Sequence, residues 1–217
     1  MKKTWAYFAV AALSTCFMST SHTSQAATLP QAKVLYKVAT TDNVVFFTAD
    51  DGADKPANAA AELERLQWPM TSFILPNNVG TYAPWFSSLG SRNDIGTHTA
   101  HHIALKGLSF EKQKTEICTG EERIKEKFGS TTGYFRPPYG SWDKTTLQAA
   151  AACGISHVVL WTVSLNGPTI TTWDGKIHPG NIVLVHYVRS MAQSIRQIEK
   201  KLRSLNLTVA CLSDYLK

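Results

Sequence analysis

Short apolar runs alternate with longer amphipathic segments along most of this chain, and this alternation limits the folds that it can adopt. The main runs are four or five residues long and rich in β-branched and aromatic residues, which is typical of buried strands; they are 44–48, 71–75, 158–161 and 182–186. Shorter runs at 94–97, 133–135 and 207–210 predict further strands. Helical patterns lie between them at 57–67, 83–89, 110–128, 143–152 and 191–205. Such alternation predicts an α/β fold with a mostly parallel sheet.

Local signals support several of these boundaries. Ser109 is a favourable N-cap for the helix at 110–128, and Gly129 is a favourable end for it. Residues 27–43 are expected to form an irregular lead-in, so that the folded domain occupies 44–217. Periodicity alone does not separate a closed barrel from an open sheet. A mature chain of about 190 residues is nevertheless short for eight complete β/α units, which typically need ~250.

The first 26 residues have the layout of a secretory signal peptide. Lys2 and Lys3 precede an apolar segment that is too short to span a bilayer, and small residues follow, with cleavage expected after Ala26 or Ala27. Lipidation at Cys16 is a weaker alternative, because the preceding residues fit a lipobox poorly. We therefore expect an exported protein, periplasmic or extracellular, with no stable membrane insertion once the signal is removed.

The charge of the mature chain argues against nucleic-acid binding. The formal charge is +6 for the whole sequence, and loss of the two signal-peptide lysines leaves +4. The basic residues are scattered among acidic ones, without aromatic–basic interleaving.

Three cysteines remain after processing, Cys118, Cys153 and Cys211, and an exported chain can join two of them. The sequence leaves the pairing open, and we expect one monomeric domain.

Two adjacent carboxylates follow the strand predicted at 44–48. In an extended strand, Asp50 and Asp51 would point to opposite faces. Gly52 permits a turn at the strand end that re-aims one of them. One carboxylate can then bind a metal while the other remains free to act as a base.

Three histidines follow the strand predicted at 94–97. His98 and His102 are four residues apart, so a helix or a tight turn would place them on one face, where they can chelate one ion. His98 and His101 would also share a face. An aspartate with two of these histidines therefore predicts a divalent metal site.

Two further segments place polar groups at strand ends. Arg136-Pro137-Pro138-Tyr139 is rigid because of its prolines, and such a loop can aim a backbone N–H at an oxyanion and hold an arginine against a carboxylate. His186 ends the apolar run at 182–186, where a histidine can act as a general acid.

Taken in order, these four segments resemble the polysaccharide deacetylases of carbohydrate esterase family 4, also called the NodB-homology domain. The matching segments are Thr48-Ala49-Asp50-Asp51-Gly52, His98-Thr99-Ala100-His101-His102, Arg136-Pro137-Pro138-Tyr139 and Leu184-Val185-His186. The resemblance spans about residues 44–216 and implies an incomplete, distorted (β/α) barrel.

The resemblance also implies a role for each matching residue. Asp50 corresponds to the catalytic base, Arg136 to the residue that holds the base, and His186 to the general acid. The metal ligands correspond to Asp51, His98 and His102. The oxyanion and substrate contacts correspond to Tyr139, through its backbone N–H, and to the neighbouring Pro138 and Leu184. One divalent ion is implied, with zinc first and cobalt or nickel as alternatives.

Two departures from the family pattern bear on the substrate. Ala49 replaces an aromatic residue, which is a change in packing. The more important departure is in the segment after Trp161. Residues 164–168 are Ser-Leu-Asn-Gly-Pro, whereas many members of the family carry an aspartate there that tunes the acid histidine. Asp174 and His178 are the nearby residues that could substitute for it. The sequence does not decide what takes its place.

We therefore expect a secreted metal-dependent hydrolase that removes N-acetyl groups from a glycan such as chitin or peptidoglycan. The first alternative is an O-acetyl esterase acting on a polysaccharide such as xylan, because an alkoxide needs less help from a general acid than an amine does. The second is a non-catalytic glycan-binding relative. The expected partner in each case is an acetylated polysaccharide or oligosaccharide.

Overall fold

The computed structural model describes Met1 and residues 29–216. The predicted signal peptide and its cleavage site lie outside these residues. Within 29–216, no helix combines the length and the apolar character that crossing a membrane requires.

A single mixed sheet forms the centre of the molecule, and most of its strands are parallel. Its order is β1-β6-β5-β4-β3-β2-β9-β7-β8, with β10 pairing with β2. Only the β7–β8 hairpin is antiparallel among these ladders. The strands are β1 Lys33–Leu35, β2 Val44–Asp51, β3 Met70–Ile74, β4 Asn93–Thr97, β5 Tyr134–Phe135, β6 His157–Val159, β7 Val163–Asn166, β8 Thr169–Thr172, β9 Ile182–His186 and β10 Thr208–Ala210.

The connection between β6 and β7 shows why the sheet is curled. These strands lie near opposite ends of the sheet order, yet Val159 and Val163 are only four residues apart in the sequence. Four residues span at most about 14 Å, so the two ends of the sheet must approach each other. The expected incomplete, distorted barrel with a mostly parallel sheet is therefore confirmed.

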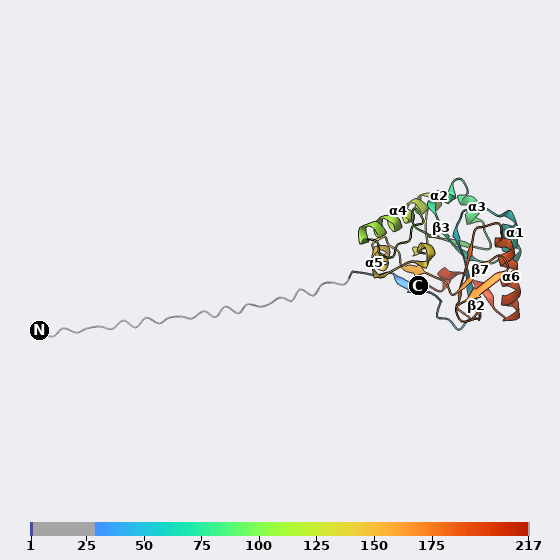
Figure 1. The fold of residues 1–217 in the computed structure, drawn as a ribbon. Coiled ribbons are helices and arrows are strands. Elements are labelled where there is room, and N and C mark those ends of the chain that lie inside the picture. The colour runs from blue at the N-terminus through green and yellow to red at the C-terminus, as the bar shows by residue number, and fades with distance from the viewer. Residues whose placement is uncertain (2–28, 217) are drawn as a thin grey trace.

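Helices cover the outside of this barrel. The helix pair α1 and α6 lies on one flank, and α4 and α5 lie on the opposite flank (Figure 1). The helices are α1 Ala57–Leu66, α2 Pro76–Val79, α3 Ala83–Ser87, α4 Phe110–Phe128, α5 Lys144–Ala152 and α6 Met191–Ser204, with short 3-10 turns at Pro138–Gly140 and Leu212–Asp214. Ser109 caps α4 and Gly129 ends it with φ 77°, as predicted.

The alternation of side chains along β2 separates two cores. Val45 and Phe47 pack with the helices α1 and α6 on the outside of the sheet. Phe46 packs instead with residues of other strands, such as Phe73 and Ile182, in the barrel interior. Since side chains two residues apart share a face, Asp50 also faces the interior, at the carboxyl end of the strand. The sheet therefore carries its acidic residue into the mouth of the barrel.

The predicted strands and long helices are present, but three strands and the short helix α2 were not expected. The lead-in contributes the strand β1, which pairs with β6 in parallel. The segment at 163–172 forms the hairpin β7–β8. β1 has only three residues and pairs with a strand far along the chain, and the two hairpin strands have four residues each, so local periodicity does not identify them.

Candidate active site

The buried ion pair between Asp50 and Arg136 lies at the inner end of the site. Arg136 is 0% exposed and Asp50 is 3% exposed. The Arg136 Nη1 donates to Asp50 Oδ1 at 2.7 Å and to Thr48 Oγ1 at 2.9 Å, while Nε and Nη2 donate to the carbonyls of Val159 and Leu160. Burial lowers the pKa of Arg136 and the Asp50 carboxylate opposes this, but arginine remains charged in proteins. The guanidinium thus fixes one oxygen of Asp50.

Asp51 is turned away from its neighbour by an unusual backbone conformation. Its φ is 74° and that of Gly52 is 68°, so both lie in the left-handed region. The carbonyl of Asp51 accepts hydrogen bonds from the Asn78 side chain at 2.8 Å and from the backbone of Leu75 at 3.2 Å, which hold this turn. Gly52 was expected to permit a turn, and the turn includes Asp51 itself. The two carboxylates consequently reach the same site from adjacent positions.

His98 enters the site from the end of β4. It is 2% exposed, and its Nδ1–H donates to the carbonyl of Arg136 at 2.7 Å. A carbonyl can only accept, so this bond fixes the tautomer and leaves Nε2 free to bind a metal. Burial lowers the pKa of His98, against the opposing effect of Asp50 and Asp51. The neutral imidazole that results is the form that coordinates a metal.

His102 reaches the same point through a tight loop. The left-handed φ values of Thr99, 71°, and His102, 58°, close this loop, and the backbone N–H of His102 donates to Thr99 Oγ1 at 3.0 Å. The His98 and His102 rings lie 5.1 Å apart between centroids. His101 points elsewhere, because its Nδ1 contacts Glu116 Oε1 at 2.8 Å. The structure therefore brings together His98 and His102.

Three side chains fit a single divalent ion. Asp51 Oδ1 lies 3.5 Å from His98 Nε2 and 3.3 Å from His102 Nε2, and one ligand atom of each residue lies within 4.8 Å of the others. Ligands about 2.1 Å from a tetrahedral zinc are separated by ~3.4 Å. Asp51 Oδ1 is also buried without a hydrogen-bond partner among the described residues, and buried carboxylate oxygens are normally satisfied. The donor set and the unsatisfied oxygen both fit a metal ion.

The loop after β5 covers one side of this set. Pro138 is buried, whereas Tyr139 is 71% exposed and has a φ of 61°. The Tyr139 ring packs edge-on against His102, with centroids 4.8 Å apart. Among the described residues, six other than glycine have a positive φ, and four of them belong to the three site loops: Asp51, Thr99, His102 and Tyr139. Strained backbone concentrated in this way is typical of functional sites.

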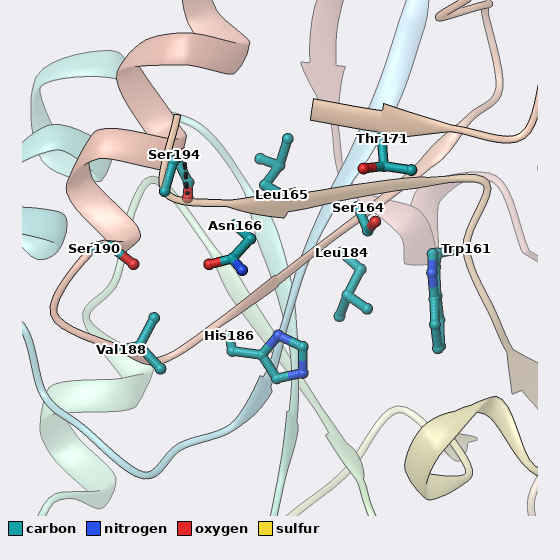
Figure 2. A pocket seen from close by; sticks show the side chains of 11 residues that line it. Trp161, Ser164, Leu165, Asn166, Thr171, Leu184, His186, Val188, Ser190 and Ser194 are labelled. Carbon is teal, nitrogen blue, oxygen red and sulfur yellow. Dashed lines mark hydrogen bonds between the residues drawn. The ribbon is translucent and has the colours of Figure 1, made fainter. Parts of the chain in front are cut away.

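A cavity of about 440 Å³ lies beside β7 and β9 (Figure 2). His186 and Leu184, at the end of β9, line it together with Trp161, which stands on the far side of Leu184 from His186. The register aligns Asp50 with His186 across β2 and β9, so His186 stands beside the ion pair. No carboxylate lines the cavity within the described chain.

The two nearby candidates for the missing carboxylate do not fill its place. Asp174 and His178 contact each other, with Asp174 Oδ2 2.9 Å from His178 Nε2, and both are well exposed. Neither lines the cavity that contains His186.

Two residues of the site carried no assignment from sequence. Thr48 accepts from Arg136 and donates to the Val183 carbonyl at 2.8 Å, so it braces the ion pair. Its position two residues before Asp50, on the same face of the strand, is the sequence feature that could have identified it. Trp161 lies 5.6 Å from the Arg136 guanidinium, measured to its ring. Its place depends on the bend between β6 and β7, which local sequence does not reveal.

Comparisons with known proteins indicate the family of this chain. The polysaccharide deacetylase family profile matches residues 37–158. An uncharacterised protein of Streptomyces coelicolor is 34% identical over 194 residues, covering 84% of this chain and 77% of that protein. A bifunctional xylanase/xylan deacetylase of Cellvibrio japonicus is 28% identical, covering 75% of this chain and 26% of that protein. Chitin deacetylase 1 of Saccharomyces cerevisiae is 30% identical, covering 77% of this chain and 60% of that protein.

A likeness in fold extends to proteins without activity. The structure of a family 4 carbohydrate esterase pseudoenzyme from Bacillus anthracis has a TM-score of 0.72 at 20% identity, covering 85% of this chain and 69% of that one. The profile match covers more than half of the sequence, and it includes both aspartates, both converging histidines and the arginine. On this evidence the chain belongs to the polysaccharide deacetylase family.

Proposed function

We propose that this protein is a metal-dependent deacetylase that hydrolyses N-acetyl groups on a glycan. The observation that carries the proposal is the convergence of Asp51, His98 and His102 beside the buried Asp50–Arg136 pair. Activity toward chitin by a relative that is 30% identical supports an N-acetylated substrate. Zinc is the metal that best suits one carboxylate and two imidazoles, and cobalt or nickel would suit the same ligands.

The roles of the residues follow from their positions. A divalent ion held by Asp51, His98 and His102 would supply Lewis acidity and make water a stronger nucleophile at neutral pH. Asp50, fixed through one oxygen by Arg136, takes a proton from the attacking water through its other oxygen. The backbone N–H of Tyr139 stabilises negative charge on the acetyl oxygen, a contact typically worth about 10²–10³ in rate.

The reaction is completed on the other side of the acetyl group. The water oxygen forms a bond to the acetyl carbon, and the bond from that carbon to nitrogen breaks. His186 gives a proton to the departing nitrogen, so the products are acetate and an amine on the sugar. Leu184 and Trp161 form apolar walls beside the acetyl group and the sugar.

Export from the cytoplasm is part of the proposal. The disulfide between Cys118 and Cys153 joins α4 to the end of α5. Disulfides persist mainly in oxidising compartments, which supports the predicted signal peptide and a periplasmic or extracellular location.

The test is release of acetate from N-acetylated chitooligosaccharides by the metal-loaded protein. We expect activity that chelation abolishes and zinc restores, and a loss of at least about 100-fold in Asp50→Asn and in His98→Ala. His101→Ala is the matched control, since His101 contacts Glu116 outside the site. Wild-type rates in Asp50→Asn and His98→Ala would show that the mechanism is wrong.

A second function is favoured by one observation, the absence of a carboxylate from the described lining of the His186 cavity. An ester releases an alkoxide, which needs less protonation than an amine does. The xylan deacetylase relative supports such a substrate. Cleavage of an acetylated xylan while N-acetylated oligosaccharides stay intact would select this function. Stoichiometric binding of glycan without acetate release from either substrate would instead indicate a non-catalytic relative.

A further inference from the structure

The cavity beside His186 contains an amide side chain that the proposed reaction has not yet used. Asn166, at the end of β7, lines this cavity together with His186, and both side chains are exposed to it. Figure 2 shows the Asn166 side chain extending toward the side of the cavity where the His186 ring lies, with its amide nitrogen on that side and its oxygen turned toward Ser190. Its neighbours in the lining are hydroxyl and apolar groups, such as Ser164 and Leu184.

The strand register places these two side chains on the same face of the sheet. β7 and β9 are parallel, with Val163 opposite Val183 and Ser164 opposite Leu184. Continuing this register by two residues places Asn166 opposite His186. Ser164 and Asn166 are two apart, as are Leu184 and His186, so each pair projects from one face of the sheet. Neighbouring strands are about 4.8 Å apart, which is within reach of two such side chains.

The chemistry of an amide suits this position. A half-turn of the Asn166 amide about its last side-chain bond brings its carbonyl oxygen to the His186 side, where it can accept a hydrogen bond from one imidazole N–H, and the other ring nitrogen then faces the leaving group. Figure 2 draws no hydrogen bond between the two side chains. Catalytic hydrogen bonds are often long in free enzymes and shorten when the substrate closes the site. A neutral amide orients the ring without adding charge.

From this geometry we propose that Asn166 is a positioning residue that orients the general acid His186, in the place left by the missing carboxylate. The proposal rests on the proposed function. It predicts that Asn166 acts only through His186 and only where the leaving group must be protonated. A residue that binds the sugar, or one that only supports the fold, would still affect the reaction when His186 is removed or when the leaving group needs no proton.

The experiment compares Asn166→Ala, Asn166→Asp, His186→Ala and the double variant Asn166→Ala/His186→Ala, with Thr169→Ala as the control. Thr169 pairs with Asn166 across the hairpin and does not line the cavity. Each metal-loaded protein is assayed for kcat and KM on an N-acetylated chitooligosaccharide. Hydrolysis of 4-nitrophenyl acetate is measured in parallel, because its phenolate leaves without protonation.

We expect Asn166→Ala to lower kcat on the oligosaccharide roughly tenfold, part of the 10²–10⁴ that general acid–base catalysis supplies. KM should change by less than about twofold, and aryl acetate hydrolysis should not change. Asn166→Asp, which keeps an acceptor at the same place, should retain most of kcat. In the His186→Ala background, Asn166→Ala should cause no further loss, because residues that act as one unit are not additive.

Several results would overturn the proposal. A rise in KM with kcat unchanged would make Asn166 a sugar contact. Equal losses on the oligosaccharide and the aryl acetate, or full additivity with His186→Ala, would indicate a general structural role. A wild-type rate in Asn166→Ala would exclude any role in the reaction. If the wild-type protein itself releases no acetate from the oligosaccharide, the proposed function fails and this inference fails with it.

Discussion

The buried pair of Arg136 and Asp50 makes a quantitative prediction about stability. Arg136 donates four hydrogen bonds, to Asp50, Thr48 and two backbone carbonyls, and both charged side chains are at most 4% exposed. In Arg136→Met, the Asp50 carboxylate would remain buried without its counter-charge. Breaking a buried pair in this way costs about 3–5 kcal/mol. That cost corresponds to roughly a thousandfold change in the unfolding equilibrium.

A double-mutant cycle separates the pair from the general effect of substitution. Asp50→Leu leaves the guanidinium unpaired and should cost a similar amount. The double variant Arg136→Met/Asp50→Leu removes both charges, so it should be more stable than the sum of the single effects by about 1–3 kcal/mol. We therefore expect the double variant to lose less free energy of unfolding than the sum of the two single losses.

The assay is urea unfolding followed by tryptophan fluorescence, with all proteins kept metal-free by a chelator and analysed by linear extrapolation. Arg196→Met is the matched control. Arg196 forms an ion pair with Glu62 at 2.9 Å, but its side chain is 53% exposed. Its loss should change the midpoint far less, because exposed pairs contribute little. Additive single effects, or a loss in Arg136→Met as small as in the control, would refute the reasoning.

Three further predictions concern the fold and the metal ligands. Removal of the disulfide by alanine substitution of both cysteines should lower the free energy of unfolding by about 4 kcal/mol, from the entropy of closing its 35-residue loop; equal urea midpoints for the oxidised protein and the variant would contradict this. His102→Ala should weaken zinc binding by at least about 100-fold in calorimetry, since loss of a residue that only hydrogen-bonds to a metal ligand already costs about 10–100-fold. The control His101→Ala should bind zinc normally. Weaker binding in His101→Ala than in His102→Ala would place the metal elsewhere. Gly120→Ala should destabilise the protein by about 1–3 kcal/mol in urea unfolding and weaken zinc binding, because the new alanine Cβ would lie 2.6 Å from the Thr99 carbonyl carbon. The control is Glu122→Ala, at an exposed position on the same helix. A neutral result for Gly120→Ala would show that the histidine loop adjusts freely.

The sequence by itself determined the class of the fold and the residues of the candidate site. Runs such as 44–48 and 182–186 bury both faces of a strand, and their alternation with amphipathic helices leaves a parallel sheet as the simple solution. The carboxyl ends of parallel strands meet at one edge, so polar residues after β2, β4, β5 and β9 were expected to lie close together. The fold class needed only local periodicity and chain order, whereas the individual site residues came from the resemblance of their motifs to a family pattern.

Other features were decided only by the tertiary structure. The pairing of Cys118 with Cys153, the strand β1 and the cavity shared by Asn166 and His186 all depend on partners far along the chain. The choice of His102 over His101 depends on left-handed residues in a loop and on a contact with Glu116. Local patterns record which face of an element is buried. They do not record which distant segment covers that face, because packing across the whole sheet selects the register and the loop conformations.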